Sequence, residues 1–341
     1  MLYISVNHHS LYWLESHTHM SSKKGPGKAF REGISLFDLV NRFPNEQSAI
    51  DWFESIRWKD GRTCPKCGSC NTYETKNANG MRYRCRDCRR YFSVKTDTVL
   101  QSSKLPLQKW VFAIFLELTS LKGVSSMKLH RDLDISQKHA WHLLHKIRES
   151  LLPEIMQAFE GPVEIDEVYL GGLEKNKHED KKLHAGRGAV GKVPVLGIKD
   201  RKTNQIQAQV IEDTTKPTIH SVIHKTTAST SFVYTDDHAS YEGLSKHYVV
   251  NHSNKQWVVS TTLGDLAHTN GIESFWATLK RAYHGTYHHI SKKHLNRYVS
   301  QFAGKHNLRS LDTIDQMEKV VEGMEGKQLR YKDLVGQERS S

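Results

Sequence analysis

Two pairs of cysteines restrict the fold of this chain more than any other feature of its sequence. Each pair encloses two residues, as Cys64-Pro-Lys-Cys67 and Cys85-Arg-Asp-Cys88. Four thiolates at such spacings enclose a Zn²⁺ ion tetrahedrally, and the ion then stands in for a hydrophobic core. We therefore predict a zinc ribbon over residues 61–98, in which these cysteines hold a structural Zn²⁺.

The remaining cysteine, Cys70, competes with Cys67 as a ligand, but the symmetry of the two Cys-x-x-Cys pairs favours Cys67. All five cysteines lie between residues 64 and 88, which does not suit the disulfide framework of a small secreted domain. Basic and aromatic residues are interleaved from Tyr83 to Phe92. This pattern predicts either phosphate contact on DNA or a solvated strand whose rings pack on the metal site.

The charge of the chain favours a polyanionic partner. Its 341 residues include 49 Lys and Arg against 37 Asp and Glu, a formal net charge of +12. This balance favours nucleic acid over a membrane surface. No apolar run approaches the roughly 18 to 20 residues that cross a bilayer, and the N-terminus does not resemble a secretory signal. We expect a soluble, cytoplasmic protein of two or three domains.

The N-terminal half is predicted to be helical on either side of the ribbon. Residues 1–34 are expected to form a disordered leader, with Met20 as an alternative start, and residues 35–60 to form two short helices. Over residues 105–152, a helix that begins at Pro106 and ends before Gly123 precedes a second one at 137–151 that follows a short turn. This arrangement resembles a helix-turn-helix, with a helical hairpin that does not contact DNA as the alternative. The polar residues predicted to be exposed on the second helix are Lys138, His139, His142, Lys146 and Arg148.

From residue 160 to residue 310 the pattern changes to strands. Strands are predicted at 163–169, 193–200, 205–212, 231–235 and 248–251, with a helix at 217–226. This order predicts a mixed sheet with crossovers and matches an RNase H-like α/β core, in which the first and fourth strands each bring an acid to one edge. We therefore expect a multidomain chain: a zinc ribbon, an all-α helix-turn-helix segment and this core. Residues 311–341 are expected to be a charged tail.

Three acids in this core form a candidate catalytic site. Asp166 and Asp236 each end a short apolar run, and Glu273 lies on a helix between His268 and Lys280. Two strand-end carboxylates and one on a helix suit a two-metal phosphoryl-transfer site. We predict two Mg²⁺ (or Mn²⁺) ions bridged by Asp166, with Asp236 on one ion and Glu273 on the other. Lys280, two turns beyond Glu273 on the same helix face, would hold a DNA phosphate, and its neighbour Arg281 is a further candidate for DNA contact.

Other polar residues near these acids are weaker candidates. Strand alternation puts Glu164 on the same face as the first acid and Glu167 on the opposite face. Asp237 would point away from the second acid. Asn270, three residues before Glu273, remains the alternative third ligand.

These motifs resemble those of insertion-sequence transposases of the ISXO-two type, bacterial relatives of the eukaryotic Merlin transposons. The resemblance rests on the segments 166–172, 234–241, 268–276 and 280–288 and covers about residues 33–309, including the ribbon. It implies an RNase H-like core of the DDE type that uses divalent metal, with Asp166, Asp236 and Glu273 as the triad. The chain departs from the family at Gly304-Lys305, where a bulkier, Arg-containing segment is usual.

The resemblance further implies an enzyme that binds the terminal inverted repeats of its element in double-stranded DNA and cleaves and rejoins strands. Synapsis of two ends requires at least a homodimer on DNA. The alternative is a DNA-binding protein without catalysis, such as a regulator or a domesticated remnant. The presence of all three acids together with Lys280 argues against that alternative.

Overall fold

A computed structural model describes residues 31–336 except 77–79, 153–157, 173–177, 184–188, 252, 253, 255, 262, 263 and 265. Most of the predicted leader therefore falls outside the described residues. The helices are α1 (Leu36–Arg42), α2 (Glu46–Arg57), α3 (Leu107–Thr119), α4 (Ser126–Asp132), α5 (Gln137–Ser150), α6 (Lys216–Thr226), α7 (Asn270–Ala282), α8 (Lys292–Leu308), α9 (Thr313–Glu322) and α10 (Tyr331–Val335). The strands are β1 (Thr72–Glu74), β2 (Tyr83–Cys85), β3 (Tyr91–Phe92), β4 (Val163–Leu170), β5 (Val193–Asp200), β6 (Ile206–Val210), β7 (Val233–Thr235), β8 (His247–Val249), β9 (Val259–Ser260) and β10 (Leu266–Ala267). Short 3₁₀ turns lie at Glu179–Lys181 and Ala239–Tyr241, and a π-helix at Tyr283–Tyr287 continues α7.

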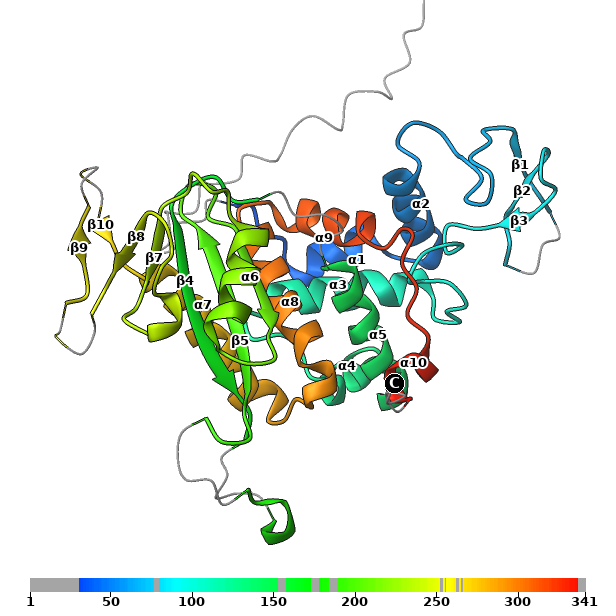
Figure 1. The fold of residues 1–341 in the computed structure, drawn as a ribbon. Coiled ribbons are helices and arrows are strands. Elements are labelled where there is room, and N and C mark those ends of the chain that lie inside the picture. Colours follow the sequence, from blue (N-terminus) through cyan, green and yellow to red (C-terminus); the bar gives the residue numbers. More distant parts are fainter. Residues whose placement is uncertain are drawn as a thin grey trace, which may run out of the picture.

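The N-terminal helices and a C-terminal helix share one hydrophobic core. Buried side chains of α2, α3 and α5 pack together with Met317, Val320 and Val321 of α9 and with Met324 just beyond it. Figure 1 shows α9 returning from the sheet side of the molecule to lie across α1 and α3. The expectation of a charged tail is therefore wrong for this segment, because the apolar face of α9 completes the core of the N-terminal helices.

The second half of the chain forms a five-stranded mixed sheet, as predicted. Its strand order is β6-β5-β4-β7-β8, with β4 antiparallel to β5, β5 antiparallel to β6, and β4, β7 and β8 parallel. Helix α6 packs on one face, and α7 and α8 pack on the other. In the part of the chain that the structure describes, no helix is long and apolar enough to span a membrane.

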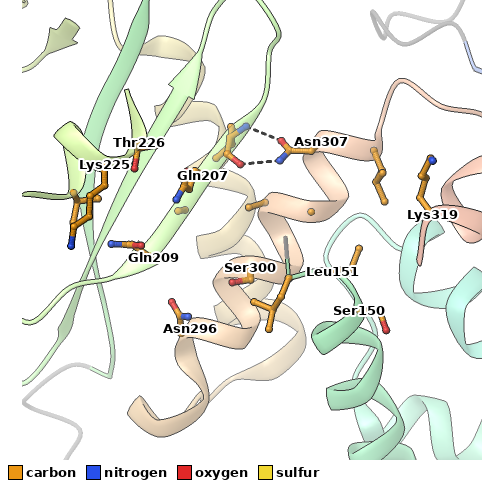
Figure 2. A pocket seen from close by; sticks show the side chains of 17 residues that line it. Ser150, Leu151, Gln207, Gln209, Lys225, Thr226, Asn296, Ser300, Asn307 and Lys319 are labelled. Atoms are coloured by element: carbon orange, nitrogen blue, oxygen red, sulfur yellow. Dashed lines mark hydrogen bonds between the residues drawn. The ribbon is translucent and has the colours of Figure 1, made fainter. Parts of the chain in front are cut away.

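Helix α8 runs along the free edge of β6 and pairs with its backbone. The amide of Asn307 donates to the Ile206 carbonyl (2.9 Å) and accepts from the Ile206 N–H (2.7 Å), as Figure 2 shows, and Asn296 accepts from the Val210 N–H (3.0 Å). A cavity of about 610 Å³ separates the two contacts. The two asparagines satisfy backbone groups that would otherwise attract a foreign strand.

A buried polar network joins α8 to the N-terminal helices. Gln301 donates to Glu117 of α3 and accepts from Arg148 Nε of α5 (2.6 Å), and each of these three side chains is at most 1% exposed. Lys305 donates to the backbone carbonyls of Glu117 (2.6 Å) and Ser120 (2.7 Å). The network fixes the helices of the N-terminal half to the sheet domain through specific hydrogen bonds.

The departure at Gly304-Lys305 therefore lies at the contact between the two halves. A Cβ at position 304 would meet the Leu151 carbonyl oxygen and Cβ at 3.1 Å, so a larger residue there would push α8 away from the end of α5. Lys305 turns its ammonium group inward, to Glu117 of α3 (3.5 Å). In this chain, Gly304 and Lys305 therefore let α8 pack closely against α5 and α3.

We predict that Glu117→Ala destabilises the fold by about 3–5 kcal/mol, because it leaves the buried Arg148 and Lys305 cations without their carboxylate. The free energy of unfolding in urea measures this loss. The matched control is Asp333→Ala, which removes the exposed pair with Arg330 (2.8 Å) and should leave the free energy of unfolding close to that of the wild type. Equal losses for the two variants would contradict the assigned importance of the network.

Candidate active site and metal centre

Strand β4 carries Asp166 in its interior, four residues before the strand ends at Leu170. The expectation that Asp166 ends its strand is wrong, because β4 pairs with β5 along its whole length. The register with β7 aligns Glu164 with Tyr234. Asp236 lies two residues beyond Tyr234, just as Asp166 lies two residues beyond Glu164 on the adjacent parallel strand, and the charge of Asp236 raises the pKa of Asp166. The first two acids are thus neighbours.

Helix α7 brings the third acid over the same face of the sheet. Gly197 of β5 lies opposite Asp166, and a Cβ there would come within 2.4 Å of the Trp276 ring and 2.9 Å of the Ile272 side chain. The missing side chain lets α7 pack directly on the sheet beside Asp166. Glu273, in the first turn of α7, accepts a hydrogen bond from the Thr269 hydroxyl (2.7 Å).

Glu164 anchors the beginning of α7. Its buried carboxylate accepts from the Ile272 N–H (2.9 Å) and from Arg201 Nε (3.1 Å), and His268 Nδ1 lies 3.4 Å away. Gly271 passes so close that a Cβ there would lie 2.6 Å from the carboxylate. Glu164 shares the α7-facing side of β4 with Asp166, as predicted, but its oxygens are committed to these donors. Its function as a helix anchor was not visible in the sequence, although an acid facing a helix N-terminus is a general signal.

Glu167 faces the opposite side of the sheet, also as predicted. It accepts a hydrogen bond from the hydroxyl of Tyr241, which is buried in the core under α6. Tyr241 belongs to the turn that follows Asp236, so this bond ties the loop of the second acid to the strand of the first. Asp237 is exposed, and the carboxylate of Asp236 caps its own loop by accepting from the His238 N–H (3.1 Å).

The three acids influence one another electrostatically. Burial, together with the charges of Glu167, Asp236 and Glu273, raises the pKa of Asp166 to about 7. Like charges within a few ångströms oppose ionisation, and divalent cations relieve this repulsion. The donor set therefore fits hard cations such as Mg²⁺ or Mn²⁺. Asn270 is exposed at the first position of α7, and Lys280 is exposed in its last turn.

The other candidate metal centre consists of Cys64, Cys67, Cys85 and Cys88. Their sulfur atoms all lie within 4.8 Å of one another, and among the described residues no other group of three or more His, Cys, Asp or Glu is as compact. The Cys64–Cys88 and Cys67–Cys85 sulfurs are 3.6 and 3.7 Å apart. Tetrahedral coordination at a Zn–S distance of about 2.3 Å requires sulfurs about 3.8 Å apart, so the four thiols fit Zn²⁺.

The ribbon around these thiols is small and docks on α2. Strands β1, β2 and β3 form one antiparallel sheet. The rings of Tyr83 and Phe92 pack with Trp58 on one side, and the Tyr83 hydroxyl donates to Glu54 of α2 (2.7 Å). Cys70 is exposed and outside the cluster, which agrees with the preference for Cys67.

The two predicted helices are present as α3 and α5, and a short helix that was not predicted, α4, lies between them; Ser136 is the N-cap of α5. Lys138 and His139 are exposed, and His142 is half-buried, its ring 3.0 Å from the Leu329 carbonyl oxygen. The prediction that Lys146 and Arg148 are exposed is wrong. Both are buried, because α8 and the segment around Gln101 cover that side of the second half of α5. Arg281 is exposed on α7 and donates to the Thr278 hydroxyl (3.2 Å).

We predict that the variant Asp166→Asn melts several degrees above the wild type at about pH 8, in buffer without Mg²⁺ or Mn²⁺, and close to it at about pH 5. The folded-state pKa lies above the unfolded value, so the wild type loses stability as the pH rises towards 7, whereas asparagine does not ionise. Melting temperatures at both pH values measure the effect. An equal difference in melting temperature at the two pH values would contradict a raised pKa of Asp166.

We also predict that Cys85→Ser abolishes binding of about one Zn²⁺ per chain and unfolds the ribbon, since metal binding and folding are coupled in such small domains. Zinc content and limited proteolysis of the ribbon measure the two effects. Cys70→Ser is the matched control and should retain wild-type zinc and protease resistance. If Cys70→Ser lost its zinc while Cys85→Ser kept it, Cys70 would be a zinc ligand in place of Cys85.

Comparison with known proteins agrees with this division of the chain. Residues 158–307 match the family model of the ISXO2-like transposase domain, and residues 44–91 match that of the transposase zinc-ribbon domain. A protein of Halobacterium salinarum, described as an uncharacterized protein in transposable element ISH50, is 28% identical over 285 residues, which cover 77% of this chain and 91% of that protein. No solved structure matches the chain significantly.

The two matched family models correspond to the ribbon and to the acid-bearing sheet described above. The sheet model spans all three acids, and the ribbon model contains the four clustered cysteines. Residues 158–307 therefore form an ISXO2-like transposase domain, which follows a transposase zinc-ribbon domain in the same chain.

Proposed function

We propose that this protein is a DDE-type DNA transposase that binds the terminal inverted repeats of its insertion sequence and catalyses metal-dependent strand cleavage and strand transfer. The observation that carries the proposal is the approach of Asp236 and Glu273 to Asp166 at one face of the sheet. The strand order, with a parallel crossover to β7 beside the antiparallel β4–β5–β6 unit, supports an RNase H-like core.

In this proposal Asp166, Asp236 and Glu273 hold two Mg²⁺ or Mn²⁺ ions. When bound, such ions stabilise charge on the attacking and leaving oxygens of a phosphodiester. The three carboxylates would hold the cations, whose charge would relieve the repulsion among these acids. Asn270 is the alternative to Glu273.

The remaining residues of the site position the acids. Glu164 fixes the N-terminus of α7, and Gly197 allows the helix to approach the sheet, so that Glu273 is held above Asp166. The Tyr241–Glu167 hydrogen bond restrains the loop of Asp236. Lys280, on the same helix as Glu273, is proposed to hold a DNA phosphate as a point charge.

Double-stranded DNA is the proposed partner of the N-terminal half. The α4–α5 pair, with Lys138 exposed, supports a helix-turn-helix. On the ribbon, Arg84 stacks on Tyr91 (4.9 Å) and Arg86 on Tyr73 (4.6 Å), which presents planar cations for phosphate contact. Two DNA ends must be brought together, so we propose a homodimer or larger assembly on DNA, acting in the cytoplasm.

The competing function is DNA binding without catalysis. Retention of three mutually repelling acids argues against it, because such a cluster lowers stability and gives a simple binding protein no benefit. A nuclease that cuts without rejoining would use the same acids, since water and a 3′-hydroxyl are interchangeable nucleophiles.

We predict that Asp236→Asn and Glu273→Gln each lower transposition by at least about a hundredfold while binding of end DNA persists, because only the metal ligands change. A donor plasmid carrying the flanking ends of the element, with excision and insertion counted in cells, measures the loss. The control is Asp237→Asn, which alters an exposed neighbouring acid and should stay active.

Each other outcome has a defined meaning. An active Glu273→Gln variant would make Asn270 the third ligand, to be tested with Asn270→Ala. A wild type that binds end DNA but never cuts it with Mg²⁺ or Mn²⁺ would overturn the transposase proposal in favour of a silent DNA-binding protein. Cleavage without insertion would identify a nuclease.

A further inference from the structure

A hollow of about 390 Å³ lies beside α7, next to the acids but on a different side of the helix. Its walls come from the end of α3, from Lys199 of β5, from α7 and from the end of α8. It is separate from the cavity of Figure 2, which lies at the β6 edge. We call this hollow the α7 groove.

The charged side chains that line the α7 groove are all basic. They are Arg31, Lys199, Lys305 and Arg309, and none of the described residues in its lining is acidic, although Glu117 lies behind Lys305. Lys305 is committed to Glu117, whereas Arg309 is exposed and its guanidinium lies 3.3 Å from His306 Nδ1. Burial lowers the pKa of His306 to about 4, so this histidine is neutral at neutral pH. It therefore adds no second positive charge beside Arg309.

Three small residues accompany Phe275 on the α7 side of the groove. Gly271, Ser274 and Thr278 lie at intervals of three and four residues, so they form one stripe along the helix. The stripe runs beside the one that carries Glu273 and Lys280. Small side chains allow a ligand backbone to approach the helix closely, and hydroxyl groups donate hydrogen bonds to that backbone. Arg281, which donates to Thr278, continues the positive charge past the end of the stripe.

Cationic side chains, hydroxyl donors and the absence of lining carboxylates suit a phosphodiester backbone. We propose that the α7 groove binds the backbone of DNA that flanks the cleaved phosphate, with Arg309 and Ser274 in direct contact. This inference rests on the proposed function, because it assigns the path by which DNA reaches the acids. Glu273 and Ser274 are adjacent in sequence, so a strand in the groove lies within about one helical turn of the metal ligands.

The test measures DNA binding by the full-length protein without Mg²⁺ or Mn²⁺, so that cleavage does not contribute. The probe is a labelled duplex from the DNA that flanks the gene, titrated at several salt concentrations. Arg309→Gln should weaken binding about three- to tenfold and lower the slope of log affinity against log salt by about 1, because one phosphate contact is lost. Ser274→Glu, which puts a negative charge in the groove, should weaken binding further.

Two variants serve as controls for charge and fold. Arg309→Lys keeps the charge and should bind within about twofold of the wild type, since most of a phosphate contact is electrostatic. Lys225→Gln removes an exposed charge from α6, which covers the other face of the sheet, and should leave affinity and salt slope unchanged. Melting temperatures establish that each variant is folded.

The groove and the proposed function fail in different ways. If Arg309→Gln and Ser274→Glu bind like Lys225→Gln while the wild type still transposes, the groove inference is overturned and the function stands. If both variants bind weakly but the wild type never cuts DNA, DNA binding by the α7 groove is supported and the proposed catalytic function is overturned. A wild type without affinity for the duplex overturns both.

Discussion

The close contact between α7 and the sheet is the constraint on which the candidate active site depends. With ordinary side chains on both the helix and the sheet, α7 would lie further from the sheet and Glu273 further from Asp166. Gly197 removes the side chain from the sheet at this point, and Trp276 fills the space. Glu164 then satisfies an N–H group of the first turn of α7, which fixes the helix along its axis. Packing and hydrogen bonding together set the position of one carboxylate.

The acids themselves oppose this arrangement. Burial and the charges of three neighbouring carboxylates raise the pKa of Asp166 to about 7, so ionising this site costs free energy. The fold tolerates that cost because its two halves are strongly connected elsewhere. The buried Glu117–Gln301–Arg148 network and α9 both cross between the sheet domain and the N-terminal helices. A rigid connection of this kind would transmit the position of DNA bound by the N-terminal half to the acids.

The sequence was a good guide where the chemistry is local. Strand alternation correctly put Glu164 and Glu167 on opposite faces, because side chains alternate between the two faces of a strand whatever strands lie beside it. The same reasoning failed for Asp166, whose strand continues because β5 pairs with all of it. It failed for Lys146 and Arg148 too, since helical periodicity identifies a face but does not reveal that a second element covers the other one.

The sequence by itself predicted the cluster of four cysteines, the five strands of the large sheet, and the three acids as a set. Each of these depends on spacing along the chain: cysteines separated by two residues, apolar runs with period two, and motifs around single carboxylates. Only the tertiary structure decided which acids are committed to hydrogen bonds, which cations are exposed, and where the C-terminal segment lies. Those properties depend on contacts between residues more than a hundred positions apart, such as Glu164 with Ile272 and Arg148 with Gln301. The burial of a side chain is a property of everything packed around it, and no local pattern contains that information.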